Sequence, residues 1–257
     1  MTADGTSGAP GSGAEAGARA AATGMKRFYT AAAAGGLPDG GFAILLDGRQ
    51  VRTPARSVLR LDSKALAAAI AEEWQRQGEF VVPASMPLTK LANTALDGVV
   101  GKEAAVAADI AAFAGSDLVC YRAEHPAELV ADQAAYWDPA LAWAEEELGV
   151  LLVTTKGVMP VAQSAASIAA MRQALSRCDA LELVALHVMT TLTGSAVLAM
   201  AVAAGRFGVA DAWAAAHVDE DHQIRHWGED TEAAERRERR WQEMQAAHRF
   251  LVLHKQV

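Results

Sequence analysis

Residues 183–204, LVALHVMTTLTGSAVLAMAVAA, contain no Asp, Glu, Lys or Arg over 22 positions. A stretch of this length and hydropathy is long enough to cross a lipid bilayer. His187, three threonines and the Gly194-Ser195 pair interrupt its apolar character, however, and it lacks the flanking cluster of Lys and Arg that marks a membrane span. We therefore interpret 180–204 as one helix buried at the centre of a helical bundle, with no stable membrane insertion. Gly194 and Ser195 are then small residues that allow neighbouring helices to pack closely.

The region before this stretch predicts β-structure. Phe42–Leu46 is a short apolar run, and Arg49–Thr53 follows it after Asp47-Gly48. Asp-Gly between two such runs is a strong hairpin signal, because a type I′ turn needs positive φ at both central positions. We therefore expect two antiparallel strands joined by a tight turn.

From residue 62 onward the apolar residues recur with a helical period. Leu66, Ile70 and Trp74 are four residues apart in a helix that we expect Asp62 to cap and Gly78 to end. In a helix over 129–148, the Asp138-Pro139 pair is expected either to kink the helix or to begin a new one with Asp138 as N-cap. Further helices are predicted at 86–97 with Ser85 as N-cap, through Val106 to Gly115, at 164–177, from about 209 and from Asp230.

These elements predict an α+β fold, in which a small β-rich N-terminal domain is followed by a larger all-α helical domain. We place the first domain, with its flanking helices, at 25–100 and the second at 101–257. Residues 1–24 are rich in Ala and Gly, so we expect a disordered tail. This tail has neither the apolar segment of a secretory signal nor the Arg-rich, acid-poor composition of a transit peptide.

Composition excludes several classes of protein. The chain has 257 residues, 52% of them hydrophobic, and a formal net charge of -8. It is therefore too apolar to be disordered as a whole and too acidic for a broad nucleic-acid footprint. Cys120 and Cys178 are the only cysteines and form no CxxC pair, which fits a reducing compartment.

Catalytic signatures are missing from the sequence. It contains no P-loop, HExxH or GxSxG motif and no GxGxxG motif between a strand and a helix, so we expect no catalytic residue and no cofactor. Asp219, His222 and His226 would share one side of a helix and could hold Zn or Fe, as in a helical metal-binding enzyme. Because no ligand pair on another helix is recognisable, we expect a solvated polar face without metal.

The same segment carries a second stripe. Trp213, His217, Glu220, Ile224 and Trp227 are spaced 4, 3, 4 and 3 residues apart and would therefore share a helix face. Glu220 is a carboxylate within this apolar face and has no basic residue four positions before or after it. It either pairs with a cation elsewhere in the chain or meets a cation on a partner.

Several strings in the chain resemble the ATP12 family, and they occur in the family's order. The resemblance covers about residues 26–251. It is carried by LDGR at 46–49, TPA at 53–55, AEEW at 71–74, MPLTKLANTALD at 86–97, SDLVCYRA at 116–123, WDP at 137–139, Asp219-Glu220 with Gln223, and WGED at 227–230.

The resemblance implies an assembly chaperone and not an enzyme. It implies that the chain binds the free α subunit of F1 ATP synthase and prevents its aggregation before the hexamer assembles. A bacterial, cytoplasmic protein that is a monomer is expected. The resemblance places partner binding at Asp219, Glu220, Gln223 and Trp227, and we expect structural roles for Trp74, Asp97 and Trp137.

Overall fold

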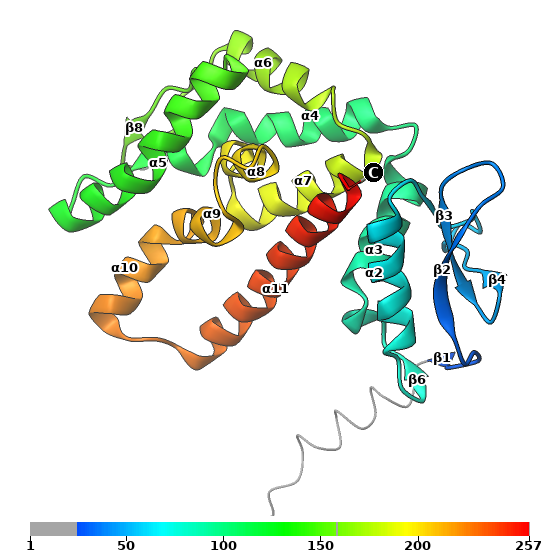
Figure 1. Cartoon of the computed structure of the whole chain (residues 1–257). Coiled ribbons are helices and arrows are strands. Elements are labelled where there is room, and N and C mark those ends of the chain that lie inside the picture. The colour runs from blue at the N-terminus through cyan, green and yellow to red at the C-terminus, as the bar shows by residue number, and fades with distance from the viewer. Residues whose placement is uncertain (1–24, 158, 257) are drawn as a thin grey trace, which may run out of the picture.

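The computed structural model of the chain describes residues 25–157 and 159–256, and the predicted tail at 1–24 lies outside them. A small strand-containing N-terminal region is followed by a helical region, which confirms the predicted fold class (Figure 1). The division into two domains at residue 100 stays a prediction. The elements are β1 (Met25–Lys26), β2 (Ala32–Gly36), β3 (Phe42–Leu46), β4 (Arg49–Gln50), β5 (Arg60–Leu61), α2 (Lys64–Gln75), β6 (Phe80–Val81), η1 (Pro83–Ser85), α3 (Pro87–Thr94), η2 (Ala95–Val99), α4 (Glu103–Phe113), η3 (Ala114–Ser116), η4 (Leu118–Cys120), β7 (Tyr121–Arg122), α5 (Ala127–Leu148), β8 (Thr155–Lys156), α6 (Ala165–Leu175), α7 (Ala180–Thr193), α8 (Ala196–Ala203), α9 (Val209–Ala216), α10 (Val218–Trp227) and α11 (Thr231–His254).

The N-terminal sheet is built on the predicted hairpin. Strands β2, β3 and β4 are antiparallel neighbours in that order, and β5 also pairs with β3. The turn at Asp47 and Gly48 has positive φ at both residues, 47° and 81°, which confirms the turn prediction. The Asp47 carboxylate also accepts hydrogen bonds from the backbone N–H groups of Thr30 and Ala31 at 3.0 and 2.9 Å. The turn therefore fixes the start of β2 as well as the hairpin.

Helix α2 covers one face of this sheet, and its cap differs from the prediction. Leu66 and Ile70 are fully buried, and the helix packs on β2 and β3. The N-cap is Ser63 and not Asp62. The Ser63 hydroxyl accepts from the Leu66 N–H at 3.2 Å and donates to the Leu253 carbonyl of α11 at 2.6 Å. An ionised aspartate has no proton to donate, which is why the buried hydroxyl and not the exposed carboxylate occupies the cap.

Helix α3 is capped by a side chain of α2. Glu73 accepts from the N–H groups of Leu88 and Thr89, both at 2.8 Å. The expected cap at Ser85 is wrong, because Ser85 lies in η1 and no side chain at the N-cap position bonds to α3. A carboxylate at the helix N-terminus satisfies two free N–H groups and also matches the helix dipole.

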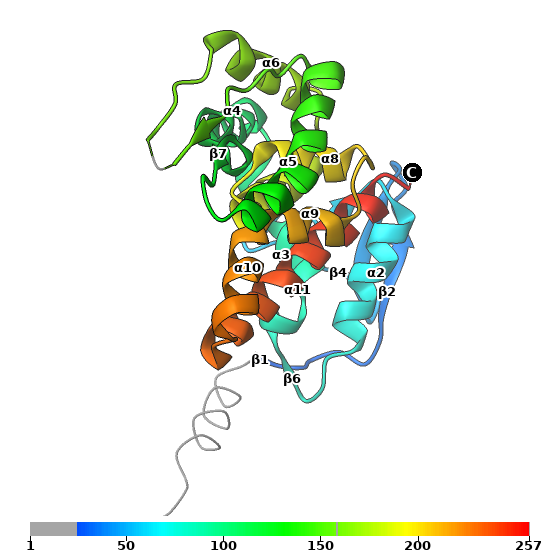
Figure 2. The same ribbon diagram turned by 90° about the vertical axis from the view of Figure 1, so that its left-hand side faces the viewer.

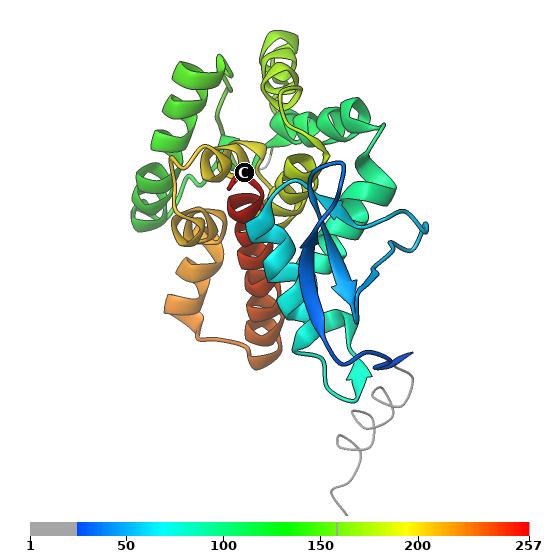
Figure 3. The same ribbon diagram turned by 45° about the vertical axis from the view of Figure 1, so that its right-hand side comes forward.

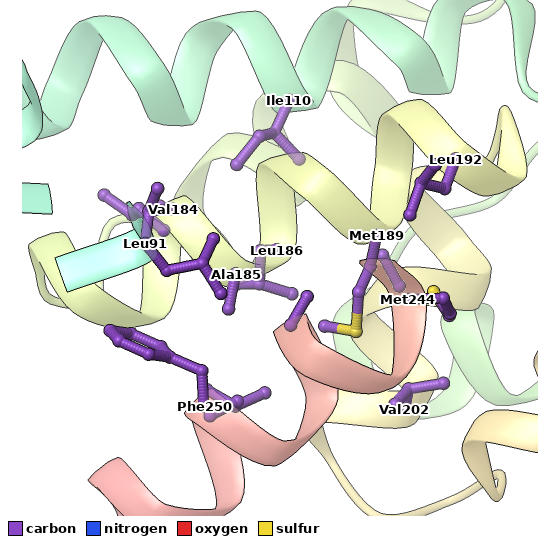
Figure 4. Packing of buried hydrophobic residues seen from close by; sticks show 14 of the residues in the cluster. Leu91, Ile110, Val184, Ala185, Leu186, Met189, Leu192, Val202, Met244 and Phe250 are labelled. Carbon is purple, nitrogen blue, oxygen red and sulfur yellow. The ribbon is translucent and has the colours of Figure 1, made fainter. Parts of the chain in front are cut away.

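Helix α7 lies at the centre of the molecule. It packs against α3, α4, α8, α9 and α11, and its side chains meet Leu91 of α3, Ile110 of α4, and Met244 and Phe250 of α11 (Figure 4). On the other side, α11 contacts α2 and α3, which separate it from the sheet (Figure 3). One continuous hydrophobic core therefore extends from the sheet to the helical region.

The charge-free stretch is not the single helix that we expected. Gly194 is left-handed, with φ 69°, and ends α7, and Ser195 caps α8. A break inside the core leaves backbone groups that must find partners there. Asp117 supplies one, since its carboxylate accepts from the Val197 N–H at 3.2 Å, and the Leu118 N–H donates to the Gly194 carbonyl at 3.1 Å. No helix in the described part of the chain is long and apolar enough for a membrane span.

Of the two alternatives at Asp138-Pro139, the start of a new helix is wrong, because α5 continues through Pro139 as one helix. Trp137, just before this pair, is fully buried and donates from Nε1 to the Ala215 carbonyl at 2.7 Å. Asp138 pairs with Arg122 at 2.8 Å. These contacts hold the helix at the two residues just before the proline and offset the hydrogen bond that proline cannot make.

The buried Asp117 makes stability depend on pH. Burial raises its pKa to about 6, although Ser195 and three backbone N–H groups donate hydrogen bonds to its carboxylate. A carboxyl whose folded pKa lies above its unfolded value binds its proton more tightly in the folded state, so its contribution falls as pH rises from about 4 to 6. We predict that the difference in unfolding free energy, wild type minus Asp117→Asn, decreases by about 2–3 kcal/mol between pH 4 and pH 7. Urea unfolding of both proteins across this range measures it, and a difference that does not change with pH would contradict the assignment.

Candidate partner-binding surface

Helix α10 forms a short, exposed element between α5 and α11 (Figure 2). His217, with φ -118° and ψ 17°, separates it from α9, and Gly228 ends it with φ 86°. The first turn of α10 holds three acidic residues and the last turn holds Arg225 and His226, which is the favourable arrangement for the helix dipole. The sequence thus sets both ends of this helix locally.

The side of α10 that faces α5 is held by packing and by polar contacts. Val218 and His222 are buried. The Asp219 carboxylate accepts from Nε2 of Gln133 at 2.6 Å, and Arg225 contacts Asp132 of α5 at 2.5 Å. The sequence predicts that Asp219 contacts a partner, but its carboxylate is bonded to Gln133 within the chain.

The opposite side of α10 carries the other three predicted partner-binding residues. Glu220, Gln223 and Trp227 share it with Ile224, because residues three and four apart lie on one face of a helix. We call these four residues the α10 outer face. Trp227 is 79% exposed, Gln223 is exposed, and Glu220 and Ile224 are half-buried.

Glu220 has neither a salt bridge nor a hydrogen-bond partner for its carboxylate among residues 25–157 and 159–256. The neighbouring acid, Asp221, does pair, with Arg237 of α11 at 2.6 Å. The sequence leaves two alternatives for Glu220, a cation within the chain or a cation on a partner. In the described part of the chain, no cation bonds to Glu220. A half-buried carboxylate on the same helix face as an exposed tryptophan is suited to a basic group on another protein.

The predicted stripe from Trp213 to Trp227 is wrong as a single face, because His217 interrupts the helix. Trp213 and His217 are buried, and their rings stack at 3.9 Å between centroids. Burial lowers the pKa of His217, which favours the neutral imidazole. The stripe thus divides into a buried aromatic pair at the end of α9 and the α10 outer face.

A pocket of about 220 Å³ lies next to α10. Arg237 lines it and also pairs with Asp221 of α10, so the pocket borders this helix. Its apolar part comes from Trp213 and Trp241, whose rings are 5.4 Å apart. The complete lining is Trp213, Glu229, Ala234, Arg237, Glu238 and Trp241. Two tryptophans with charged neighbours offer a place for a side chain of a partner.

Three residues of α5 were missed by the sequence analysis. Gln133 is buried and bridges the Ala123 N–H, at 2.7 Å, to Asp219. Glu128 and Asp132 both contact Arg225. These contacts join segments far apart in the chain, and helical periodicity carries no information about such pairs.

The structure brings together two of the three candidate metal ligands, His222 and His226, and leaves Asp219 outside the group. Asp219 is bound to Gln133, whereas His222 and His226 lie beside Glu128 of α5. The sequence predicts no metal here because no ligand on a second helix is recognisable in it, and Glu128 of α5 is such a residue.

The three residues expected to be structural lie at contacts between elements. Trp74 is half-buried, its ring packs edge-on against Tyr29, and its carbonyl accepts from the Tyr29 hydroxyl at 2.7 Å. Asp97 accepts from the Thr53 hydroxyl at 2.6 Å, which ties η2 to the loop after β4. Trp137 joins α5 to the end of α9.

Neither cysteine has the environment of a nucleophile. Burial raises the pKa of Cys120 to about 12 and that of Cys178 to about 11. Both groups are therefore thiols and not thiolates at neutral pH.

Comparison with known proteins identifies the family. A family model described as "ATP12 chaperone protein" matches residues 26–145. The structure of Atp12 from Paracoccus denitrificans is 41% identical, with a TM-score of 0.85, and the match covers 90% of this chain and 98% of that one. The chain belongs to the ATP12 family.

Two further structures support this membership. A point mutant of Atp12p from Paracoccus denitrificans is 40% identical, with a TM-score of 0.85 and coverage of 90% of this chain and 98% of that one. The Atu1473 protein of Agrobacterium tumefaciens, described as a proposed chaperone, is 47% identical, with a TM-score of 0.84 and coverage of 88% and 85%. The matches therefore extend the ATP12 family assignment over the C-terminal helices, which contain α10.

The contact between Asp219 and Gln133 predicts unequal effects of two neighbouring substitutions. Asp219→Ala leaves the buried Gln133 amide without its acceptor, and we expect a loss of about 1–3 kcal/mol in unfolding free energy. Asp219→Asn keeps a carbonyl acceptor and should cost less. Gln223→Ala, on the outer face, should change stability by less than about 0.5 kcal/mol. Urea unfolding compares the variants, and equal losses for Asp219→Ala and Gln223→Ala would show that the contact with α5 does not hold the helix.

Proposed function

We propose that this ATP12-family chaperone binds the free α subunit of F1 ATP synthase and prevents its aggregation before the hexamer assembles. Family membership and the likeness to Atp12 support the chaperone role. The unpaired carboxylate and exposed tryptophan of the α10 outer face carry the proposal for the contact. The similar structures come from two bacteria, which supports the proposal of a bacterial cytoplasmic protein. We further propose that the protein is a monomer and does not insert stably into a membrane.

The α10 outer face recognises the client by two different interactions. Trp227 supplies a large apolar anchor, which loses water on binding. Glu220 pairs with a Lys or Arg of the α subunit and sets the orientation of the complex, because a charge pair formed in a partly dry interface discriminates strongly against like charge. Gln223 adds hydrogen-bonding capacity between them. No covalent chemistry is needed for this task, so we propose a non-enzymatic chaperone.

The alternative function, a helical metal-binding enzyme using Asp219, His222 and His226, is less well supported. Asp219 is bonded to Gln133 and does not join the two histidines. We therefore retain the chaperone as the proposed function and place client binding on the α10 outer face.

Reversal of the charge at Glu220 tests the proposal. We expect Glu220→Lys to fold normally, because its carboxylate has no bonded partner among the described residues, and to retain at least tenfold less α subunit in a pull-down. Glu220→Gln should have a smaller effect, since it preserves shape and hydrogen bonding. Glu145→Lys is the matched control, because Glu145 is exposed near the other end of α5.

Circular dichroism and the pull-down are measured on all three variants. Unfolding of Glu220→Lys would show that Glu220 is a structural acid. Full retention of the α subunit by a folded Glu220→Lys would place the client contact elsewhere.

A further inference from the structure

We propose that Glu128 of α5 and His222 and His226 of α10 form a zinc-binding site that links the two helices. One ligand atom from each residue lies within 4.8 Å of the others. Nε2 of His226 is 3.9 Å from Oε2 of Glu128, and the two imidazole rings are 4.2 Å apart between centroids. The site thus combines a histidine pair at i, i+4 with a carboxylate from a different helix.

The tautomer of His226 suits a metal ligand. Its Nδ1 lies 2.8 Å from the carbonyl oxygen of His222, and only a protonated Nδ1 can donate to that oxygen. Nε2 of the neutral ring then keeps its lone pair on the side of Glu128. A hydrogen bond from the second ring nitrogen to a backbone carbonyl is the usual way in which proteins orient a metal-bound histidine.

The charges around the site favour a cation. Arg225 contacts two of the three ligands, because its guanidinium lies 3.4 Å from Nδ1 of His222 and also reaches Glu128, but Asp132 holds it at 2.5 Å. Its contact with Glu128 is longer, at 3.5 Å, and both side chains are substantially exposed. Such an exposed ion pair contributes little, so a metal displaces it at small cost. The two carboxylates of Glu128 and Asp132 and the guanidinium of Arg225 together carry a net charge of about -1.

The donor set fits zinc. Two imidazoles and one carboxylate suit Zn²⁺, with water in the fourth position, and do not suit Ca²⁺ or Mg²⁺, which prefer oxygen ligands. Zinc bonds of about 2.0–2.2 Å require ligand atoms roughly 3.3 Å apart in a tetrahedron. The 3.9 Å separation between His226 and Glu128 must therefore close by about 0.6 Å, and the separations to His222, which lie within 4.8 Å, by up to about 1.5 Å. The side chains of His226 and Glu128 are 44% and 59% exposed, so these two side chains make the movement toward His222, which is buried.

A bound ion would restrict the motion of α10 against α5 and so hold the α10 outer face in one orientation. This consequence for client binding rests on the proposed function, whereas zinc binding itself does not. The two are separable because zinc binding is measured on the chaperone alone.

The test uses the full-length chain, purified without a histidine tag and freed of metal with EDTA. Isothermal titration with ZnCl₂ is expected to show one ion per chain, and zinc is expected to raise the melting temperature. His226→Ala and Glu128→Gln should each weaken binding at least tenfold and abolish the shift in melting temperature. His187→Gln, which alters a histidine on α7, is the matched control and should behave as wild type.

Absence of zinc binding to the wild-type protein would overturn the site. Unchanged affinity in both His226→Ala and Glu128→Gln would overturn it as well, because the ion would then be held elsewhere. Zinc binding with the expected variant pattern, together with failure of the α-subunit pull-down, would uphold the site and reject the proposed function.

Discussion

The fold depends on the need to enclose a 22-residue stretch without a formally charged side chain. Exposure of this stretch to water would be costly, so helices from both ends of the chain pack around α7. The break at Gly194 adds a second requirement. The first backbone N–H groups of α8 lie inside the core and need hydrogen-bond acceptors there. Asp117 meets that requirement at the expense of placing a carboxyl group where water does not reach. The helical region is thus organised around α7 and around the polar contact at its end.

The motifs that resemble the ATP12 family act largely as such polar contacts. Five acidic residues within the motif strings each contact another segment of the chain, through a hydrogen bond or a salt bridge. They are Asp47, Glu73, Asp97, Asp117 and Asp138. A chaperone that covers a client needs a surface of fixed shape, and these contacts stabilise the scaffold that presents α10. The resemblance in these strings therefore reflects mainly residues that stabilise the fold. Glu220 and Trp227 differ from these five residues, because they lie on the α10 outer face.

The sequence predicts the fold well where the signal is local. The two short runs on either side of Asp47-Gly48 predict the hairpin, helical periodicity locates α2, α4 and α6, and the helix expected from Asp230 is α11. The errors arose where a distant contact overrides a local rule. Pro139 stays inside α5 because Trp137 is anchored to α9. The helix can break at Gly194 because Asp117 accepts a hydrogen bond from a backbone N–H group at the start of α8.

The candidate site shows the same limit. Helical spacing correctly places Glu220, Ile224 and Trp227 on one face of α10, since all three lie within one helix. It could not show that Gln133 binds Asp219 or that Glu128 approaches the histidines, because those contacts join separate helices. It also joined Trp213 to this face, because a single non-helical residue at His217 has no signal in apolar spacing.

The central claim is that the α10 outer face contacts the client. A photo-crosslinking amino acid placed at Gln223, which is exposed and bonds to no other described residue through its side chain, tests this claim most directly. The same group at Glu145 is the control. Irradiation in the presence of F1 α subunit should yield a crosslinked complex from position 223 and none from position 145. Crosslinking from position 145 alone, or equal yields from both positions, would contradict the account.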